Sequence, residues 1–311
     1  MIGVRPTEVA PWQRLGAPAD HARTREDVTM DPLLAAALRH LGIDDPPRPL
    51  TQDHTTAWRV GQWKIKTATE PADAAPLLHE AHAVALLHAR GLHPVDATSG
   101  RLAQGAWTAI PWRSGTTLWD WGRAARETPT PEHGRWLRAI AHHAFTALHR
   151  LHAAGWRHGD VQPANILVTP DGAVEFIDHD LSHHRHDLPL PGPYRGGMDQ
   201  STAPEIAREL LGTEPDVDIT LTTAAEIYSL GASLRWAWTG HAPATTRLLG
   251  PDVTPRDILE DIATGRHRPP LSPELPWPDP ELENLIEATT TPDPSRRSTS
   301  ATSTENPTHG R

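Results

Sequence analysis

HGDVQPANILVTPDGAVEFIDHD, residues 158–180, sets three polar side chains around two short apolar runs. The runs NILV and AVEFI flank the turn sequence Thr-Pro-Asp-Gly, so we expect a hairpin with Asp171 in its turn. Pairing about that turn brings Asn165 and Asp178 together at the open end, and Asp160 directly precedes the first strand. Carboxylate and amide oxygens suit Mg²⁺, and a further free carboxylate can accept a proton. The stretch therefore predicts a site where two groups hold a metal–nucleotide and a third addresses an incoming hydroxyl.

The composition bounds the class of protein. The chain has 311 residues, enough for two lobes around a cleft, and its net charge of -10 argues against a general binder of nucleic acid or anionic membranes. The lack of cysteine excludes disulfides and thiolate chemistry. Apolar runs fall short of the roughly 18 residues that span a bilayer, and the N-terminus lacks a secretory pattern. We expect a cytoplasmic protein without nucleic-acid or membrane partners, and the sequence sets no oligomeric state.

The order of the expected elements predicts an α+β chain. A helix is expected over DPLLAAALRHLG, with Asp31 as its cap and Gly42 as its stop. Alternating apolar residues in TTAWRVGQWKIKTA predict a strand hairpin, and helical spacing predominates later in the chain. Strands therefore dominate early and helices late. The expected parts are a leader at 1–48, a small lobe at 49–113, a larger helical lobe at 114–297 and a disordered tail at 298–311.

Lysine usage singles out one of the expected strands. Lysine occurs only at Lys64 and Lys66, whereas the other basic residues are 27 arginines. A chain so biased toward arginine is expected to keep lysine where a compact ammonium on a slim stem is needed, with chance as the alternative. Residues two apart on a strand share a face, so the two ammoniums should point the same way.

Six motifs in order resemble one protein family. HGDVQPAN resembles the protein-kinase catalytic loop H-R-D-x-x-x-x-N, and IDHD stands where that family has D-F-G. Four further kinase elements are matched, in order, by WKIK, by HEAHAVALL, by TAPEI, and by the pair AEIYSLGASLRWAWTG and DPSRR. Across residues 50–300 the chain is similar to eukaryotic-type Ser/Thr protein kinase domains of bacterial style. The resemblance implies a bilobal α+β fold, with a small antiparallel-sheet N-lobe holding one helix and a larger, mostly helical C-lobe.

The resemblance also implies catalytic and metal-binding roles. Lys66 would bind the α- and β-phosphates of ATP, and Glu80 would pair with it. Asp160 would take or orient the proton of the substrate hydroxyl. Asn165 and Asp178 would bind Mg²⁺, and the additional carboxylate Asp180 would help them. Lys66 fits the family's register better than Lys64, so Lys64 is expected to have no role in the site.

The adenine is expected to lie against the segment from Ile110 to Arg113, with Trp112 beside it and hydrogen bonds through the backbone. The glycine-rich phosphate loop of the family is missing, since Gly61 is the only glycine between residues 50 and 66. The hydroxyl or amide groups of Thr55 and Thr56 are expected to bind phosphate instead.

Further departures concern the catalytic loop. Gly159 replaces the arginine that commonly reads an activation-loop phosphate, and Gln162 replaces a lysine that would stabilise the transferring phosphoryl group. Glu226 replaces an aspartate that anchors the loop, and its extra methylene predicts a looser anchor. Glu205 and Arg297 are expected to form a structural ion pair.

Three functions remain open from the sequence. The leading one is an ATP- and Mg²⁺-dependent Ser/Thr protein kinase with a protein or peptide substrate, favoured by TAPEI and AEIYSLG. A small-molecule kinase of the aminoglycoside-phosphotransferase type is favoured by HGD, IDHD and the missing glycines. A pseudokinase that binds partners is favoured by the missing loop and Gln162, whereas the two retained lysines count against it.

Overall fold

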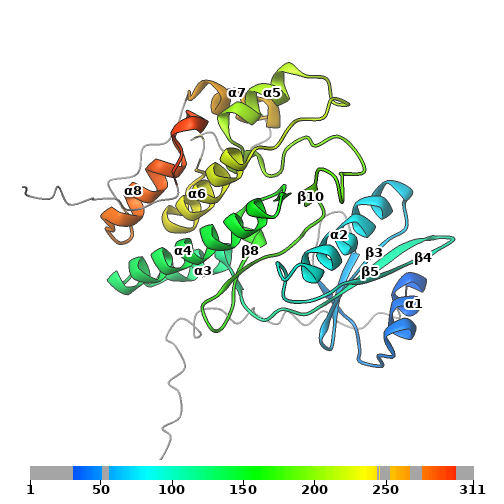
Figure 1. The fold of residues 1–311 in the computed structure, drawn as a ribbon. Helices are drawn as coiled ribbons and strands as arrows, with labels where there is room; N and C mark the ends of the chain where they lie inside the picture. The colour runs from blue at the N-terminus through cyan, green and yellow to red at the C-terminus, as the bar shows by residue number, and fades with distance from the viewer. Residues whose placement is uncertain (1–30, 51–55, 244, 246–252, 267–274, 299–311) are drawn as a thin grey trace, which may run out of the picture.

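The computed structural model describes residues 31–50, 56–243, 245, 253–266 and 275–298. Thr55 and residues 299–311 of the expected tail lie outside this description, as do residues 1–30 of the expected leader. In Figure 1 the strands of the first part lie at one end of the molecule, and helices α3 to α8 lie at the other.

The first part is a five-stranded antiparallel sheet in the order β1-β2-β3-β5-β4. Two helices pack on it, α1 (Pro32–Leu41) and α2 (Pro71–Ala89). Side chains alternate between the two faces along a strand, so Ile65 and Ala68, three residues apart on β3, point to opposite faces. Ile65 packs in the apolar cluster with α1 and Ala68 in the one with α2, so the two helices cover opposite faces of the sheet. The strands are β1 (Arg48–Leu50), β2 (Thr56–Val60), β3 (Trp63–Ala68), β4 (Thr98–Leu102) and β5 (Gly105–Pro111).

Helix α1 begins and ends as the sequence predicted. The Asp31 carboxylate accepts a hydrogen bond from the Leu33 N–H, and Gly42 ends the helix with a left-handed φ of +66°. The other Asp31 oxygen accepts from the Thr67 hydroxyl at 2.8 Å, which ties the start of the helix to β3. The helix expected in the leader is thus part of the packing around the sheet.

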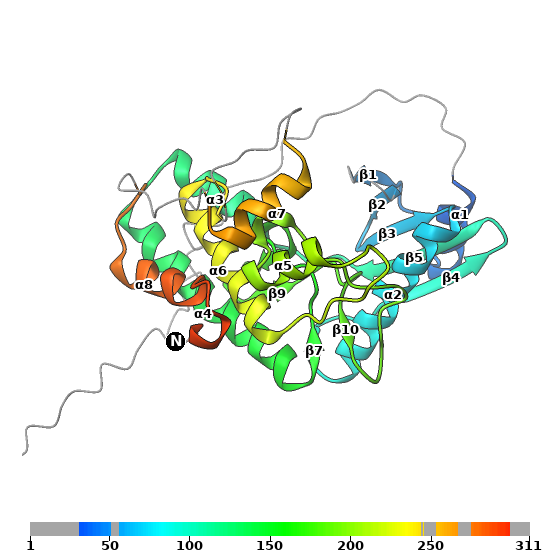
Figure 2. The ribbon, with the colours of Figure 1, turned by 90° about the horizontal axis from the view of Figure 1, so that it is seen from above.

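The second part is mostly helical. Buried side chains of α3, α4, α6 and α8 form the largest apolar cluster, with Trp121, Trp156 and Trp238 among its fully buried members. The helices are α3 (Leu118–Glu127), α4 (Pro131–Ala153), α5 (Pro204–Gly212), α6 (Thr223–Thr239), α7 (Pro255–Thr264) and α8 (Pro280–Thr289). Figure 2 shows them gathered beside the sheet and its two helices, which confirms the predicted order of a small sheet lobe and a larger helical lobe.

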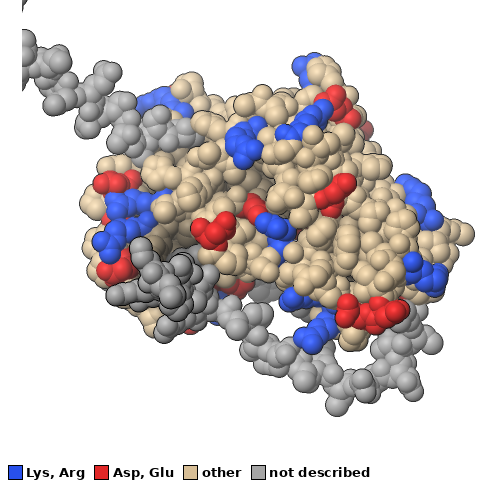
Figure 3. All heavy atoms as spheres, turned by 60° about the horizontal axis from the view of Figure 1, so that its bottom comes forward, with Lys and Arg blue, Asp and Glu red and all other residues tan. Residues whose placement is uncertain are grey.

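The second part also contains short paired strands. β8 (Ile166–Val168) pairs with β6 (Thr116–Thr117) and β9 (Val174–Phe176), and β7 (Trp156–Arg157) pairs with β10 (His183–His184). Single-turn helices lie at residues 163–165, 199–201 and 294–296. Within the described ranges, every helix is too short or too polar to cross a bilayer. On the face drawn in Figure 3, acidic and basic side chains are interspersed.

Candidate active site

The hairpin predicted from residues 158–180 forms. Ile166 pairs with Phe176 in the ladder, and the Thr169 hydroxyl donates to Asp171 in the turn. At the open end the Ile177 N–H donates to the Asn165 carbonyl at 3.0 Å, which sets Asn165 beside the residue before Asp178. The pairing therefore brings the two expected metal ligands to the same edge.

Asp178 adopts a backbone conformation that is unusual for its residue type. Its φ is +66°, the only positive value among the non-glycine residues that the structure describes. Aspartate tolerates this region better than most residues, but the conformation still costs free energy that the surroundings must offset. The offset includes an ion pair, because the Lys66 ammonium lies 2.5 Å from Asp178 Oδ1.

Lys66 is the centre of a charge cluster between the lobes. Its side chain is buried, and its ammonium donates to both carboxylate oxygens of Glu80, at 3.0 and 2.8 Å. Burial opposes the charge, but the carboxylates of Glu80 and Asp178 raise the pKa of Lys66 above its usual value. Burial likewise opposes ionisation of Asp178, but the two nearby lysines lower its pKa. Lys66 and Asp178 are thus charged at neutral pH, and the contacts of Lys66 with Glu80 and Asp178 hold α2 against the hairpin.

The Asp160 carboxylate is surrounded by neutral donors. Oδ2 accepts from the amides of Asn165 at 2.8 Å and Gln162 at 2.5 Å, and Oδ1 accepts from the Met198 N–H at 2.9 Å. Gly197 permits this approach, because a Cβ there would lie 2.3 Å from Asp160 Oδ1. The amide nitrogen of Asn165 faces Asp160, so its amide oxygen is left as a potential metal ligand.

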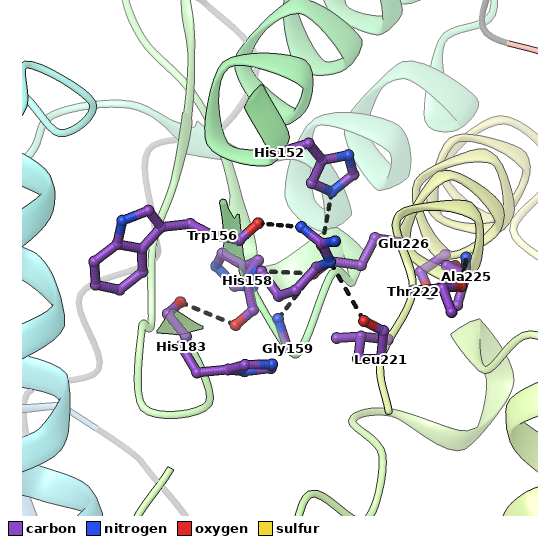
Figure 4. Close-up of polar contacts among 12 residues, drawn as sticks. His152, Trp156, His158, Gly159, His183, Leu221, Thr222, Ala225 and Glu226 are labelled. Carbon is purple, nitrogen blue, oxygen red and sulfur yellow. Dashed lines mark hydrogen bonds and ion pairs between the residues drawn. The ribbon is translucent and has the colours of Figure 1, made fainter. Parts of the chain in front are cut away.

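Glu226 anchors the loop that carries Asp160. Its Oε1 accepts from the backbone N–H groups of His158 at 2.8 Å and Gly159 at 2.9 Å, and Figure 4 shows these groups converging on it. Oε2 lies 2.7 Å from His152 Nε2, which must carry the proton because an ionised carboxylate only accepts. Burial opposes ionisation, but the contacts with His152 and Gly159 lower the pKa of Glu226. The expected looser anchor stays a prediction, although the buried carboxylate makes three contacts at 2.7, 2.8 and 2.9 Å.

A cavity of about 250 Å³ opens between the sheet and the hairpin. Ile110, Trp112 and Arg113, the residues expected to contact adenine, all line it. The backbone N–H of Trp112 donates to the Gln62 carbonyl, and Arg113 Nε donates to Glu175 Oε2 at 2.8 Å, so both residues are held in place.

The residues expected to replace the glycine loop are only partly described. Thr56 begins β2, where it is exposed and pairs with Thr67. It is not among the described residues that line the cavity. Thr55 belongs to the undescribed segment. The role assigned to both threonines stays a prediction.

The donor set suits a divalent metal held largely by phosphate and water. Asn165 and Asp178 offer hard oxygens, whereas groups of three or more acidic or histidine side chains at metal-binding distances are absent from the described residues. Mg²⁺ typically binds through one or two carboxylates and substrate phosphates, which matches this sparse set. Asp180 is close by, but burial and the charges of Asp178 and Glu80 raise its pKa to about 7. Asp180 is therefore only partly ionised at neutral pH until a cation joins it.

Two features of the site were not predicted from the sequence. Lys64, expected to have no role, lines the cavity with its ammonium 4.0 Å from Asp178 Oδ1. The strand face that Lys64 shares with Lys66 was the sequence signal for this position. Three histidine rings pack against one another without stacking: His158 and His179 are tilted, with centroids 4.9 Å apart, and His93 meets His179 edge-on, with centroids 5.3 Å apart. With 20 histidines in the chain, the sequence offered no signal for this cluster.

The ion pair predicted between Glu205 and Arg297 is confirmed, with Nη2 and Oε2 2.7 Å apart. The guanidinium also lies over the ring of Tyr228, with 5.0 Å to the centroid. The pair fastens the start of α5 to the end of the helical part.

Comparisons with known proteins agree with these motifs. The chain matches no protein-family model. It is 35% identical over 153 residues to serine/threonine-protein kinase PknA of Mycobacterium tuberculosis, which covers 49% of this chain and 31% of the relative. It is 36% identical over 96 residues to serine/threonine-protein kinase PknK of the same species, covering 31% and 8% of the two chains.

A third relative is serine/threonine-protein kinase AfsK of Streptomyces griseus, 36% identical over 113 residues, or 35% of this chain and 12% of the relative. The chain thus matches less than a third of the length of each of these relatives. The ordered motifs, the bilobal fold and these similarities together support a kinase domain of the eukaryotic type, similar to those of the matched bacterial Ser/Thr protein kinases.

Proposed function

We propose that the protein is an ATP- and Mg²⁺-dependent Ser/Thr protein kinase. One observation carries the proposal: Lys66 contacts both Glu80 and Asp178, which line the cavity, and the loop and hairpin that lead to Asp178 also present Asp160 and Asn165. These are the groups that phosphoryl transfer needs, because its catalysis consists mainly of positioning and of stabilising negative charge.

Each of these side chains has a task in the transfer. Lys66 binds the phosphates, while Glu80 keeps its ammonium in place. Asp160 accepts the hydroxyl proton as the hydroxyl oxygen bonds to the γ-phosphorus and the bond to ADP breaks. For this, the substrate hydroxyl takes the position at Asp160 Oδ1 that the Met198 N–H now occupies. Gln162 offers a neutral amide in place of a lysine, so transition-state charge is stabilised less strongly there.

Asn165 and Asp178 would hold the metal. Mg²⁺ bound there would neutralise phosphate charge and orient the group that is transferred. Asp180 would add a third oxygen once the metal charge lowers its pKa.

The activation segment favours a polypeptide substrate. Residues 197–203 pass beside Asp160 and continue into α5, which the pair of Glu205 and Arg297 anchors. A rigid segment next to the proton acceptor is suited to position an extended peptide. A nucleotide-binding pseudokinase is the second candidate, because neutral donors of the chain itself already contact both oxygens of Asp160.

Calorimetric titration with ATP, with and without Mg²⁺, tests the nucleotide site. We expect binding that depends on Mg²⁺ and is lost in Lys66→Ala, because that variant removes the buried ammonium. Absence of binding at millimolar ATP would contradict the proposal. Transfer to Ser/Thr peptides then separates the kinase from the pseudokinase.

A further inference from the structure

Lys64 faces the same cavity as the catalytic cluster. It lies on β3 opposite Ile110 of β5, two residues before Lys66, which lies opposite Thr108. Its ammonium is 4.0 Å from Asp178 Oδ1, the same oxygen that Lys66 contacts at 2.5 Å. Two ammonium groups, the only lysines of the chain, therefore approach one carboxylate oxygen.

The two lysines differ in their access to the cavity. Lys66 is 6% exposed and does not border the cavity, because Glu80 and Asp178 enclose its ammonium. The Lys64 side chain is 22% exposed and lines the cavity together with Leu50, Ile110 and Trp112. Lys64 is thus the ammonium that a ligand entering the cavity meets first.

Lys64 also lacks strong compensation for its charge. Within the described residues its sole polar contact is the 4.0 Å approach to Asp178, whose charge Lys66 already balances. A partly buried ammonium without a close partner is unfavourable, and an anionic ligand would relieve that cost.

We propose that Lys64 is a second phosphate-binding residue of the nucleotide site, supplying a contact that a glycine-rich loop would otherwise make; this inference rests on the proposed function. Residues two apart on a strand are roughly 6.6–6.8 Å apart, so the two ammoniums can contact successive phosphates of one polyphosphate. If Asp178 held a metal ion, its contacts with both lysines would weaken, and the two ammoniums would be available to phosphate oxygens.

The test measures binding of Mg²⁺-ATP, Mg²⁺-ADP and adenosine by calorimetry to the wild-type chain, Lys64→Met and Lys64→Arg. Methionine keeps most of the length of lysine and removes its charge. We expect Lys64→Met to weaken ATP and ADP binding about tenfold or more, as for loss of a charge-assisted hydrogen bond, and adenosine binding less than twofold. Lys64→Arg should retain most of the affinity for ATP. Arg101→Met, an exposed position on β4 of the same sheet, is the matched control and should bind like the wild type.

The outcomes separate this inference from the proposed function. Wild-type affinity for ATP in Lys64→Met would overturn the role of Lys64 and leave the nucleotide site intact. Equal weakening for ATP and adenosine would overturn it too, since Lys64 would then act on the base or ribose. Tighter ATP binding would show that Lys64 obstructs the cavity. A wild-type chain that binds no nucleotide would refute the proposed function, and the role of Lys64 with it. Thermal unfolding without ligand confirms that the variants are folded.

Discussion

Replacing Glu226 with alanine tests how the catalytic loop is held. The carboxylate is buried and accepts from the N–H groups of His158 and Gly159, and from His152. Alanine removes all three hydrogen bonds and leaves two buried backbone donors without a partner in the loop that carries Asp160.

The contacts set the size of the effect. A buried donor that loses its partner costs about 1–3 kcal/mol, so two orphaned N–H groups predict a loss of about 2–6 kcal/mol in the free energy of unfolding. Glu226→Gln keeps one oxygen for both N–H groups, and its amide can donate to His152 in the other tautomer. That variant loses mainly the assistance of the charge, which predicts about 1–2 kcal/mol.

Urea unfolding followed by tryptophan fluorescence measures both losses, since the chain has 12 tryptophans. Glu287→Ala, at an exposed position on α8, is the control and should stay within about 0.5 kcal/mol of the wild type. Two results would refute the reasoning: a loss below about 1 kcal/mol for Glu226→Ala, or equal losses for alanine and glutamine.

Three further predictions concern the hairpin and its neighbours. Asp178→Asn should abolish Mg²⁺-dependent transfer while far-UV circular dichroism stays unchanged, because Glu80 still pairs with Lys66; undiminished turnover would refute the metal assignment. Gly197→Ala should lower turnover at least tenfold with little change in ATP affinity, since its Cβ would meet Asp160 Oδ1 at 2.3 Å; steady-state kinetics on a peptide substrate would decide. Burial and two neighbouring histidines hold the pKa of His179 well below its usual value, so the unfolded chain binds the extra proton as pH falls below about 6.5. His179 should therefore contribute a fall in the free energy of unfolding of up to about 1.4 kcal/mol per pH unit from pH 6.5 downward, and His179→Phe should reduce the slope in urea titrations accordingly; an unchanged slope would count against a neutral His179.

Local patterns predicted much of the fold. The cap at Asp31, the stop at Gly42 and the turn at Asp171 depend on residues a few positions apart, and the structure has all three. The ion pair of Lys66 and Glu80 followed from the order of motifs, and it forms.

What the sequence did not predict depends on contacts between distant segments. The Met198 N–H reaches Asp160 from 38 residues away, and His152 reaches Glu226 from 74 residues away. Neither contact leaves a local pattern, because each depends on how the loops and helices pack. Lys64 is an intermediate case: its strand face was predictable, whereas its distance to Asp178 required the two lobes to be placed.

Transfer of phosphate to serine or threonine is the activity that we propose for this site. The most direct measurement is incorporation of label from γ-labelled ATP into a Ser/Thr peptide library, by the wild-type chain and Asp160→Asn, with and without Mg²⁺. We expect labelled serine or threonine with the wild type and Mg²⁺, and a fall of at least about 100-fold in Asp160→Asn, as for loss of a general base. Equal labelling by both proteins, in a preparation that binds Mg²⁺-ATP, would contradict it.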